Sequence, residues 1–214
     1  MLGKSDAHDR VVSNILNRYI TEDRGLWYGS GPYKVPRFLL NDIARYWRTM
    51  AVDLAYKQRT RGGDGFALRT IKLRISRKLI YIAGLLSCFS YELDLDPALR
   101  RTMFNGSGPL PALAHLKACM MRAPLEITAG ALLLFPELDL HSSALFSAYD
   151  DFLGLLANDD KRASLKNMPF DDLPKSPIFK EAQLISYRFR DAVSSIFLKP
   201  DNLLGKLTIE YGVF

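Results

Sequence analysis

Cysteine and histidine are scarce in this chain of 214 residues, which holds two of the first and three of the second. Cys88 and Cys119 both lie in apolar runs, and two cysteines cannot build a disulfide framework. We therefore expect free, buried thiols in a reducing, cytoplasmic compartment. We interpret none of the three histidines, His8, His115 and His141, as having a second histidine or cysteine at metal-ligand spacing. We accordingly expect no zinc site.

Long hydrophobic runs are also missing. The longest nearly uncharged run, Leu79–Phe89, has eleven residues, whereas a membrane-spanning helix needs about 20. The first ten residues are polar and hold no apolar signal core. These absences exclude a membrane partner and secretion from our expectations. With 48% hydrophobic and 24% charged residues, the composition is that of a soluble globular protein with a sizeable core.

Strand-like alternation of apolar and polar residues is confined to Leu207–Val213. Helical periodicity dominates elsewhere, and the sequence predicts an all-α bundle of about seven helices in a single domain, residues 1–214. Residues 22–36 and 164–178, rich in proline or glycine, are predicted loops. The predicted helices span residues 5–20, 37–58, 66–89, 97–104, 111–122, 124–135, 141–158 and 179–198.

Motifs for catalysis are absent: the chain has no GxSxG elbow, no GxxxxGK[ST] loop and no GxGxxG turn. The stretch 106–108, Gly-Ser-Gly, lacks a preceding strand and a following lysine, so we interpret it as a linker. Glu92, Asp94 and Asp96 alternate, as carboxylates do when a strand presents them to magnesium. Pro97 instead favours Asp96 as a helix cap. The sequence identifies no catalytic residues.

Positive charge is concentrated in residues 45–78, here called the basic segment. It holds ten basic and two acidic residues, a net charge of +8 against +6 for the whole chain, so the rest carries −2. Such a field attracts phosphate-bearing partners. The alternative is a solvated surface whose charges pair with acids elsewhere. The acids suggested for such pairs are Asp150, Asp151, Asp159 and Asp160.

Two predicted helices of the basic segment meet at a glycine-rich turn, residues 61–65, where positive φ angles are expected. If they form a hairpin, its cations converge near the turn and bind phosphate oxygens. Tyr46 and Tyr56 could stack on a base, whereas Trp47 lies on the apolar stripe of its helix. The candidate phosphate-binding residues are Arg59, Arg61, Arg69, Lys72, Arg74, Arg77 and Lys78.

Part of the chain resembles a known family. The segments RFLLNDIARYWRT (Arg37–Thr49), LRTIKLRISRKL (Leu68–Leu79) and LSCFS (Leu86–Ser90) are similar to the helical region that follows the catalytic domain in bacterial nucleotidyltransferase-domain proteins of the polymerase-β-like superfamily. The resemblance is strongest over residues 37–90. The catalytic glycine-serine turn and its strand with two carboxylates are not present: Gly84 precedes Leu85.

The resemblance implies an accessory helical module that recognises a nucleotide or nucleic acid, with catalysis supplied by an upstream domain or a separate chain. The module itself is expected to hold no cofactor, and Mg²⁺ enters only if that catalytic partner is present. Two alternatives are a free-standing nucleic-acid-binding protein and a protein-interaction module with no catalytic role. The sequence leaves its oligomeric state open.

Overall fold

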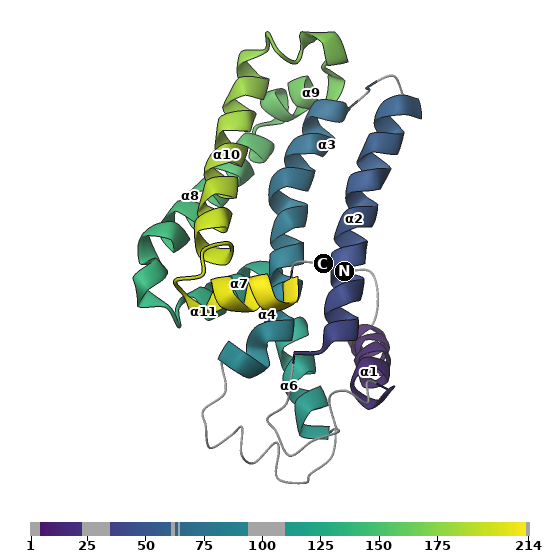
Figure 1. Cartoon of the computed structure of the whole chain (residues 1–214). Coiled ribbons are helices and arrows are strands. Elements are labelled where there is room, and N and C mark those ends of the chain that lie inside the picture. The colour runs from purple at the N-terminus through teal and green to yellow at the C-terminus, as the bar shows by residue number, and fades with distance from the viewer. Residues whose placement is uncertain (1–4, 23–34, 61–62, 64, 94–109, 213–214) are drawn as a thin grey trace. The chain divides into compact units, whose positions relative to one another are not determined.

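A computed structural model describes residues 5–22, 35–60, 63, 65–93 and 110–212 (Figure 1). Within these residues every regular element is a helix and no strand occurs, which confirms the predicted all-α, multi-helix fold. No described helix combines the length and apolar character that crossing a bilayer requires. The helices are α1 (Ser5–Glu22), α2 (Arg37–Thr60), α3 (Phe66–Lys72), α4 (Lys78–Leu93), α6 (Leu110–Met120), α7 (Pro124–Leu132), α8 (Asp139–Ala157), α9 (Asp159–Asn167), α10 (Pro177–Phe197) and α11 (Leu203–Leu207).

Two segments differ from their predictions. Residues 164–167, predicted as loop, form the end of α9, and a short 3₁₀ turn, Phe170–Asp172, follows. The Asn158 side chain caps α9 by accepting a hydrogen bond from the Lys161 N–H at 2.9 Å. Since Leu165 is the buried residue of this helix, almost no apolar periodicity marked it. The predicted helix 97–104 lies outside the described residues.

The tail is helical rather than extended. α11 continues into a π-helical segment, Thr208–Gly212, where the sequence alternates as a strand would. Leu204, Leu207 and Thr208 are buried, and their spacing of three and one fits a single helix face. The Thr208 hydroxyl donates to the Leu204 carbonyl at 2.7 Å, which satisfies it within the helix.

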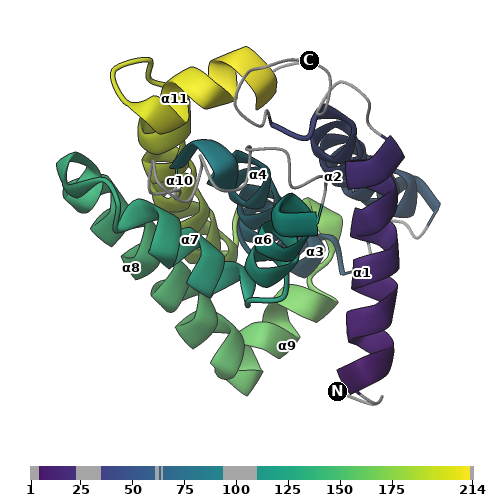
Figure 2. The same ribbon diagram turned by 90° about the horizontal axis from the view of Figure 1, so that it is seen from below.

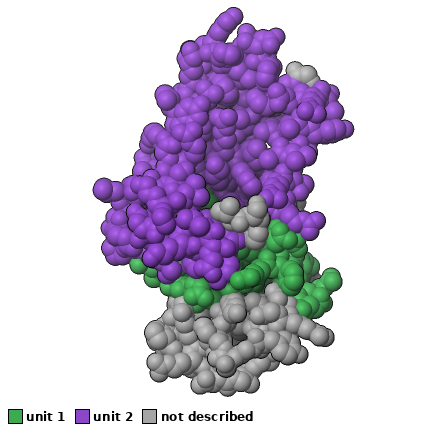
Figure 3. Space-filling model, in the orientation of Figure 1, with its two compact units in different colours: residues 1–43, 82–134 green, residues 44–81, 135–214 purple. Residues whose placement is uncertain are grey.

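The chain divides into two compact units, each described by itself (Figure 3). Unit 1 comprises residues 1–43 and 82–134, and unit 2 comprises residues 44–81 and 135–214. In unit 1, α1 packs on α6, and the Lys117 ammonium pairs with Asp9 at 2.8 Å. The Tyr19 hydroxyl donates to Asp42 at 2.5 Å, which ties α1 to the start of α2.

In unit 2, α8 and α10 lie side by side, and α10 also contacts α3 and the π-helical segment Leu73–Arg77 (Figure 2). Phe152 and Phe189 are fully buried between these helices, each with its ring near that of Tyr149. The helix from Phe66 to Leu93 runs through α3, the π-helical segment and α4 without a break. Seven apolar residues recur along it at spacings of three and four: Leu68 is half-buried, and Ile71, Ile75, Leu79, Ile82, Leu86 and Phe89 are buried.

α2 is packed far less tightly than the sequence suggests. The apolar stripe that contains Trp47 recurs at spacings of three and four: Leu40 is buried, but Ile43, Trp47, Met50 and Leu54 are only half-buried. α2 and α3 run antiparallel and are joined at the glycine-rich turn (Figure 1). Gly63 and Gly65 adopt the expected positive φ angles of 84° and 63°. The Gly63 N–H donates to the Gln58 carbonyl at 3.2 Å, which closes the turn.

Gly205 and Gly154 provide a stability test. A Cβ at Gly205 would lie 1.7 Å from the Lys199 carbonyl oxygen, whereas a Cβ at Gly154, within α8, would meet nothing within 4 Å. We predict that Gly205→Ala lowers the free energy of unfolding by about 2–3 kcal/mol through overpacking. Gly154→Ala should raise it by about 0.5–1 kcal/mol, because alanine favours the helix. Denaturant unfolding followed by circular dichroism measures both, and equal stabilities would contradict the described packing of α11.

Candidate anion-binding site

The seven predicted phosphate-binding residues do not all gather in one place. Arg59 is exposed near the end of α2, and Arg61 lies outside the described residues. Arg69 bends back to the turn, where its guanidinium lies beside Gly65. Lys72 is half-buried on α3. The other three, Arg74, Arg77 and Lys78, are half-buried within or next to the π-helical segment.

None of the cations on the Phe66–Leu93 helix has a carboxylate partner within the described part of the chain. Arg69, Lys72, Arg74, Arg77 and Lys78 make no ion pair with any described residue. Two acids suggested as their partners are engaged elsewhere.

Asp151 accepts from Arg188 at 2.8 Å, and Asp159 accepts from Arg162 at 2.6 Å. Near the turn, Lys57 is paired with Asp53 at 2.6 Å, as the i,i+4 spacing predicts. The alternative interpretation, a solvated surface whose charges pair with acids elsewhere, therefore does not hold for the described part of this helix.

Arg74 and Lys78 come together with a third cation from α10. The pKa of Lys78 is lowered from its ordinary 10.5, first by burial, then by Arg190 and then by Arg74. Burial and like charge both disfavour the ammonium form, so Lys78 sits in a positive field. We call Arg74, Lys78 and Arg190 the cation cluster. It belongs wholly to unit 2.

Arg190 is the member that the sequence did not reveal. It lies between Phe189 and Asp191 on α10, with a second arginine, Arg188, two residues earlier. Its guanidinium donates through Nε and Nη2 to one oxygen of Asp191, at 2.8 and 2.7 Å, and lies 4.9 Å from the ring centre of Tyr187. Only the packing of α10 on α3 and the π-helical segment brings it toward the cluster. No local sequence motif predicts that contact between helices.

Two polar atoms on the cluster's side of the helix are buried without a partner among the described residues. They are Nη1 of Arg74 and the hydroxyl oxygen of Thr70, one turn earlier. The Thr70 residue is only 6% exposed. Leaving a buried donor unsatisfied costs about 1–3 kcal/mol, more for a charged group. Such a cost is removed when a ligand supplies acceptors.

The π-helical segment, Leu73–Arg77, interrupts the α-helical bonding beside the cluster. Its i→i+5 bonding is rare and is found mostly as single turns at functional sites. Ile75 within it is fully buried, so the segment is held by the core and not frayed. It widens the helix where Arg74 and Arg77 project.

The aromatic residues of α2 are divided between packing and solvent. Trp47 is half-buried, with its ring 5.7 Å from that of Tyr81. Tyr46 and Tyr56 are 61% and 64% exposed. The two tyrosines suggested as base-stacking groups are thus accessible, and Trp47 packs as its place on the stripe indicated.

A second polar group in unit 1 was missed although the sequence contained its signal. His115 and Cys119 are one helical turn apart on α6, and the imidazole Nε2 lies 3.7 Å from the Cys119 sulfur. The same Nε2 lies 3.0 Å from the Ser90 hydroxyl, which donates to the Ser87 carbonyl at 2.7 Å. Cys119 is half-buried rather than buried, whereas Cys88 is fully buried and burial raises the pKa of its thiol.

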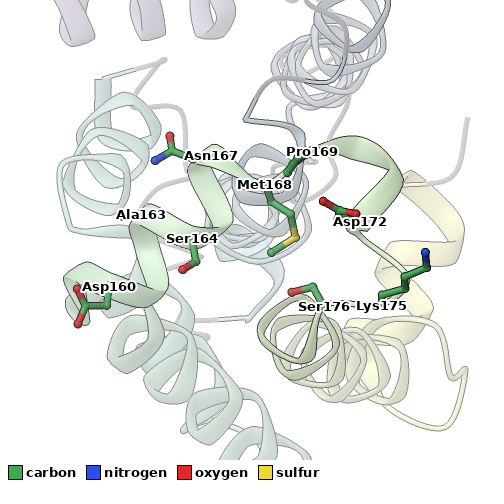
Figure 4. A pocket seen from close by; sticks show the side chains of 9 residues that line it. All are labelled: Asp160, Ala163, Ser164, Asn167, Met168, Pro169, Asp172, Lys175 and Ser176. Atoms are coloured by element: carbon green, nitrogen blue, oxygen red, sulfur yellow. The ribbon is translucent and has the colours of Figure 1, made fainter.

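The described residues form no group of three metal-ligating side chains. A pocket of about 710 Å³ lies between α9 and the start of α10, with Met168 between Asp160 and Lys175 (Figure 4). None of the seven predicted residues and none of the cation cluster lines it. Its charges are mixed and its walls are largely exposed, so the pocket does not select an ion of one sign.

Comparison with known proteins adds no assignment: no family model, no curated protein and no solved structure matches this chain.

Lys78 offers a test of the positive field. Because its pKa is lowered in the fold, the unfolded chain binds more protons between that lowered pKa and 10.5, and stability rises with pH in this window. We predict that Lys78→Met raises the free energy of unfolding at pH 7 by about 1 kcal/mol, the usual scale of single substitutions. The variant should also lack the part of the rise in unfolding free energy with pH that Lys78 contributes. Thermal unfolding at pH 7 and pH 10 measures both effects.

The control is Lys175→Met, since Lys175 is exposed. Equal effects of the two substitutions on stability would contradict a specific cost at Lys78.

Proposed function

We propose that this protein is a phosphate-recognition module, an accessory domain of a nucleotidyl-transfer system that presents the Phe66–Leu93 helix to a nucleotide or nucleic acid. The observation that carries the proposal is the set of half-buried cations on this helix, which have no carboxylate partner in the described part of the chain. Cations at such a boundary interact more strongly with anions than fully solvated ones do. The resemblance of residues 37–90 to nucleotidyltransferase-associated helices agrees with this role.

Catalysis in such a system comes from a separate domain or chain that supplies the metal-binding carboxylates. This chain would hold the phosphate-bearing substrate, and Tyr46 and Tyr56 are exposed where a base could stack on them. Magnesium would be bound by the catalytic partner and not by this chain. We expect the chain alone, given Mg²⁺ and nucleoside triphosphates, to incorporate no nucleotide into an RNA or DNA primer. Robust incorporation by the chain alone would contradict an accessory role.

Binding is tested by fluorescence anisotropy with a single-stranded oligonucleotide over a series of salt concentrations. Affinity should fall linearly with salt on logarithmic axes, with a slope set by the phosphates neutralised. The double variant Arg74→Glu/Arg77→Glu should bind about tenfold more weakly at low salt, because it reverses two charges at the helix.

A matched double variant, Lys175→Glu/Lys180→Glu, makes the same charge change at exposed positions at and before the start of α10. It should bind nearly as the unchanged protein does. Equal losses in the two doubles would show that net charge alone drives binding and would defeat the proposed surface.

A protein-interaction role is the second candidate, and a specific observation favours it. Residues 44–60 of α2 contain no buried side chain, and Val52 is 67% exposed one turn before Tyr56. An apolar helix side left open in this way suits a protein partner. Sedimentation of the chain with and without Val52→Asp separates the candidates, because self-association that this change abolishes favours interaction over phosphate recognition.

A further inference from the structure

We propose that Arg74, Lys78 and Arg190 form a site for an oligophosphate group, a short chain of linked phosphates such as a nucleoside triphosphate or an inorganic oligophosphate carries. The proposal deepens the proposed function, because it names the ligand class of the same surface. It adds α10 to a surface that the sequence assigned to one helical hairpin alone.

The first argument is the density of charge. Arg74 and Lys78 are four residues apart on one helix, α10 packs on the same part of that helix, and Arg190 of α10 is one of the charges that lower the pKa of Lys78. Three cations in one place match several adjacent negative charges. A nucleic-acid backbone carries one charge per phosphate, spaced along the strand, and is better matched by cations arranged in a line.

The second argument is the set of unsatisfied donors. Nη1 of Arg74 and the Thr70 hydroxyl are buried and have no partner among the described residues. Phosphate oxygens accept such donors, and an arginine fork binds two of them at once. A ligand rich in acceptor oxygens would thus relieve a desolvation cost that the fold alone leaves in place.

The third argument concerns how Arg190 is held. Two of its three nitrogens are bound to one oxygen of Asp191, and the guanidinium lies by the Tyr187 ring. These contacts fix the side chain and leave Nη1 uncommitted to that carboxylate. Asp191 also weakens the local positive field, so it opposes anion binding while it orients Arg190. The two neighbours on α10 should therefore have opposite effects on an anionic ligand.

The test measures binding of inorganic tripolyphosphate to the full chain by isothermal titration calorimetry, in buffer free of divalent ions. Arg190→Gln should weaken binding about tenfold, the scale of losing one hydrogen bond from a charged donor together with its charge. Arg190→Lys should recover only part of it, because lysine lacks the fork. Asp191→Asn should strengthen binding several-fold, since it removes a competing negative charge.

Arg188→Gln is the matched control. Arg188 lies two residues earlier on α10, its side chain is 52% exposed against 56% for Arg190, and it pairs with Asp151. The same charge change there should leave tripolyphosphate binding within about twofold. Equal losses from Arg188→Gln and Arg190→Gln, or no loss from Arg190→Gln, would overturn the site. Circular dichroism verifies that each variant is folded.

Two further ligands show which part of the ligand is recognised, and they distinguish failure of the oligophosphate site from failure of the proposed phosphate-recognition function. Adenosine triphosphate that binds more tightly than tripolyphosphate shows that the nucleoside contributes, and equal affinity shows that the phosphate chain suffices; either agrees with the site. A single-stranded oligonucleotide with a 5′-hydroxyl that binds while tripolyphosphate does not would overturn the oligophosphate site and leave phosphate recognition standing. Failure of all three ligands to bind would overturn both.

Discussion

Positive charge held against an apolar core, with no carboxylate partner among the described residues, is the constraint on which the rest of unit 2 depends. The Phe66–Leu93 helix buries Ile71, Ile75 and Leu79 on one face. Cations at the positions between them are therefore held half-buried at the edge of the core. The effect of this position on a cation is clearest at Lys78, because burial and the charges of Arg190 and Arg74 lower its pKa. A fold that keeps such a group gives up stability at neutral pH, and the proposed anionic ligand would offset that cost.

Much of the fold follows from periodicity. The Phe66–Leu93 helix and α10 carry apolar residues every three or four positions, and most of these residues are buried, whereas Leu68 and Val193 are half-buried. The glycine-rich turn was evident because Gly63 and Gly65 need positive φ angles. α9 was not, since a helix fixed by a cap and by Leu165 alone leaves little periodic signal. The helical tail was obscured by a short alternation that burial of Leu204 and Leu207 overrides.

The candidate site was only partly predictable, because it depends on which helices pack together. Arg74 and Lys78 belong to the segment whose net charge marked it from the outset. Arg190 is more than a hundred residues away along the chain, and only the contact between α10 and the π-helical segment brings it near. The sequence placed Arg74 among seven candidate residues of one hairpin, whereas the electrostatic effect on Lys78 groups Arg74 with Lys78 and Arg190. The i,i+4 pair His115 and Cys119 needed no packing information and was simply overlooked.

The ionisation of Lys78 tests this account most directly. Lysine labelled with ¹⁵N allows the pKa of each side-chain ammonium to be followed by NMR. The account predicts that the Lys78 pKa lies below 10.5 in the free protein and rises when inorganic phosphate is added. A Lys78 that titrates like the exposed lysines and does not respond to phosphate would contradict it.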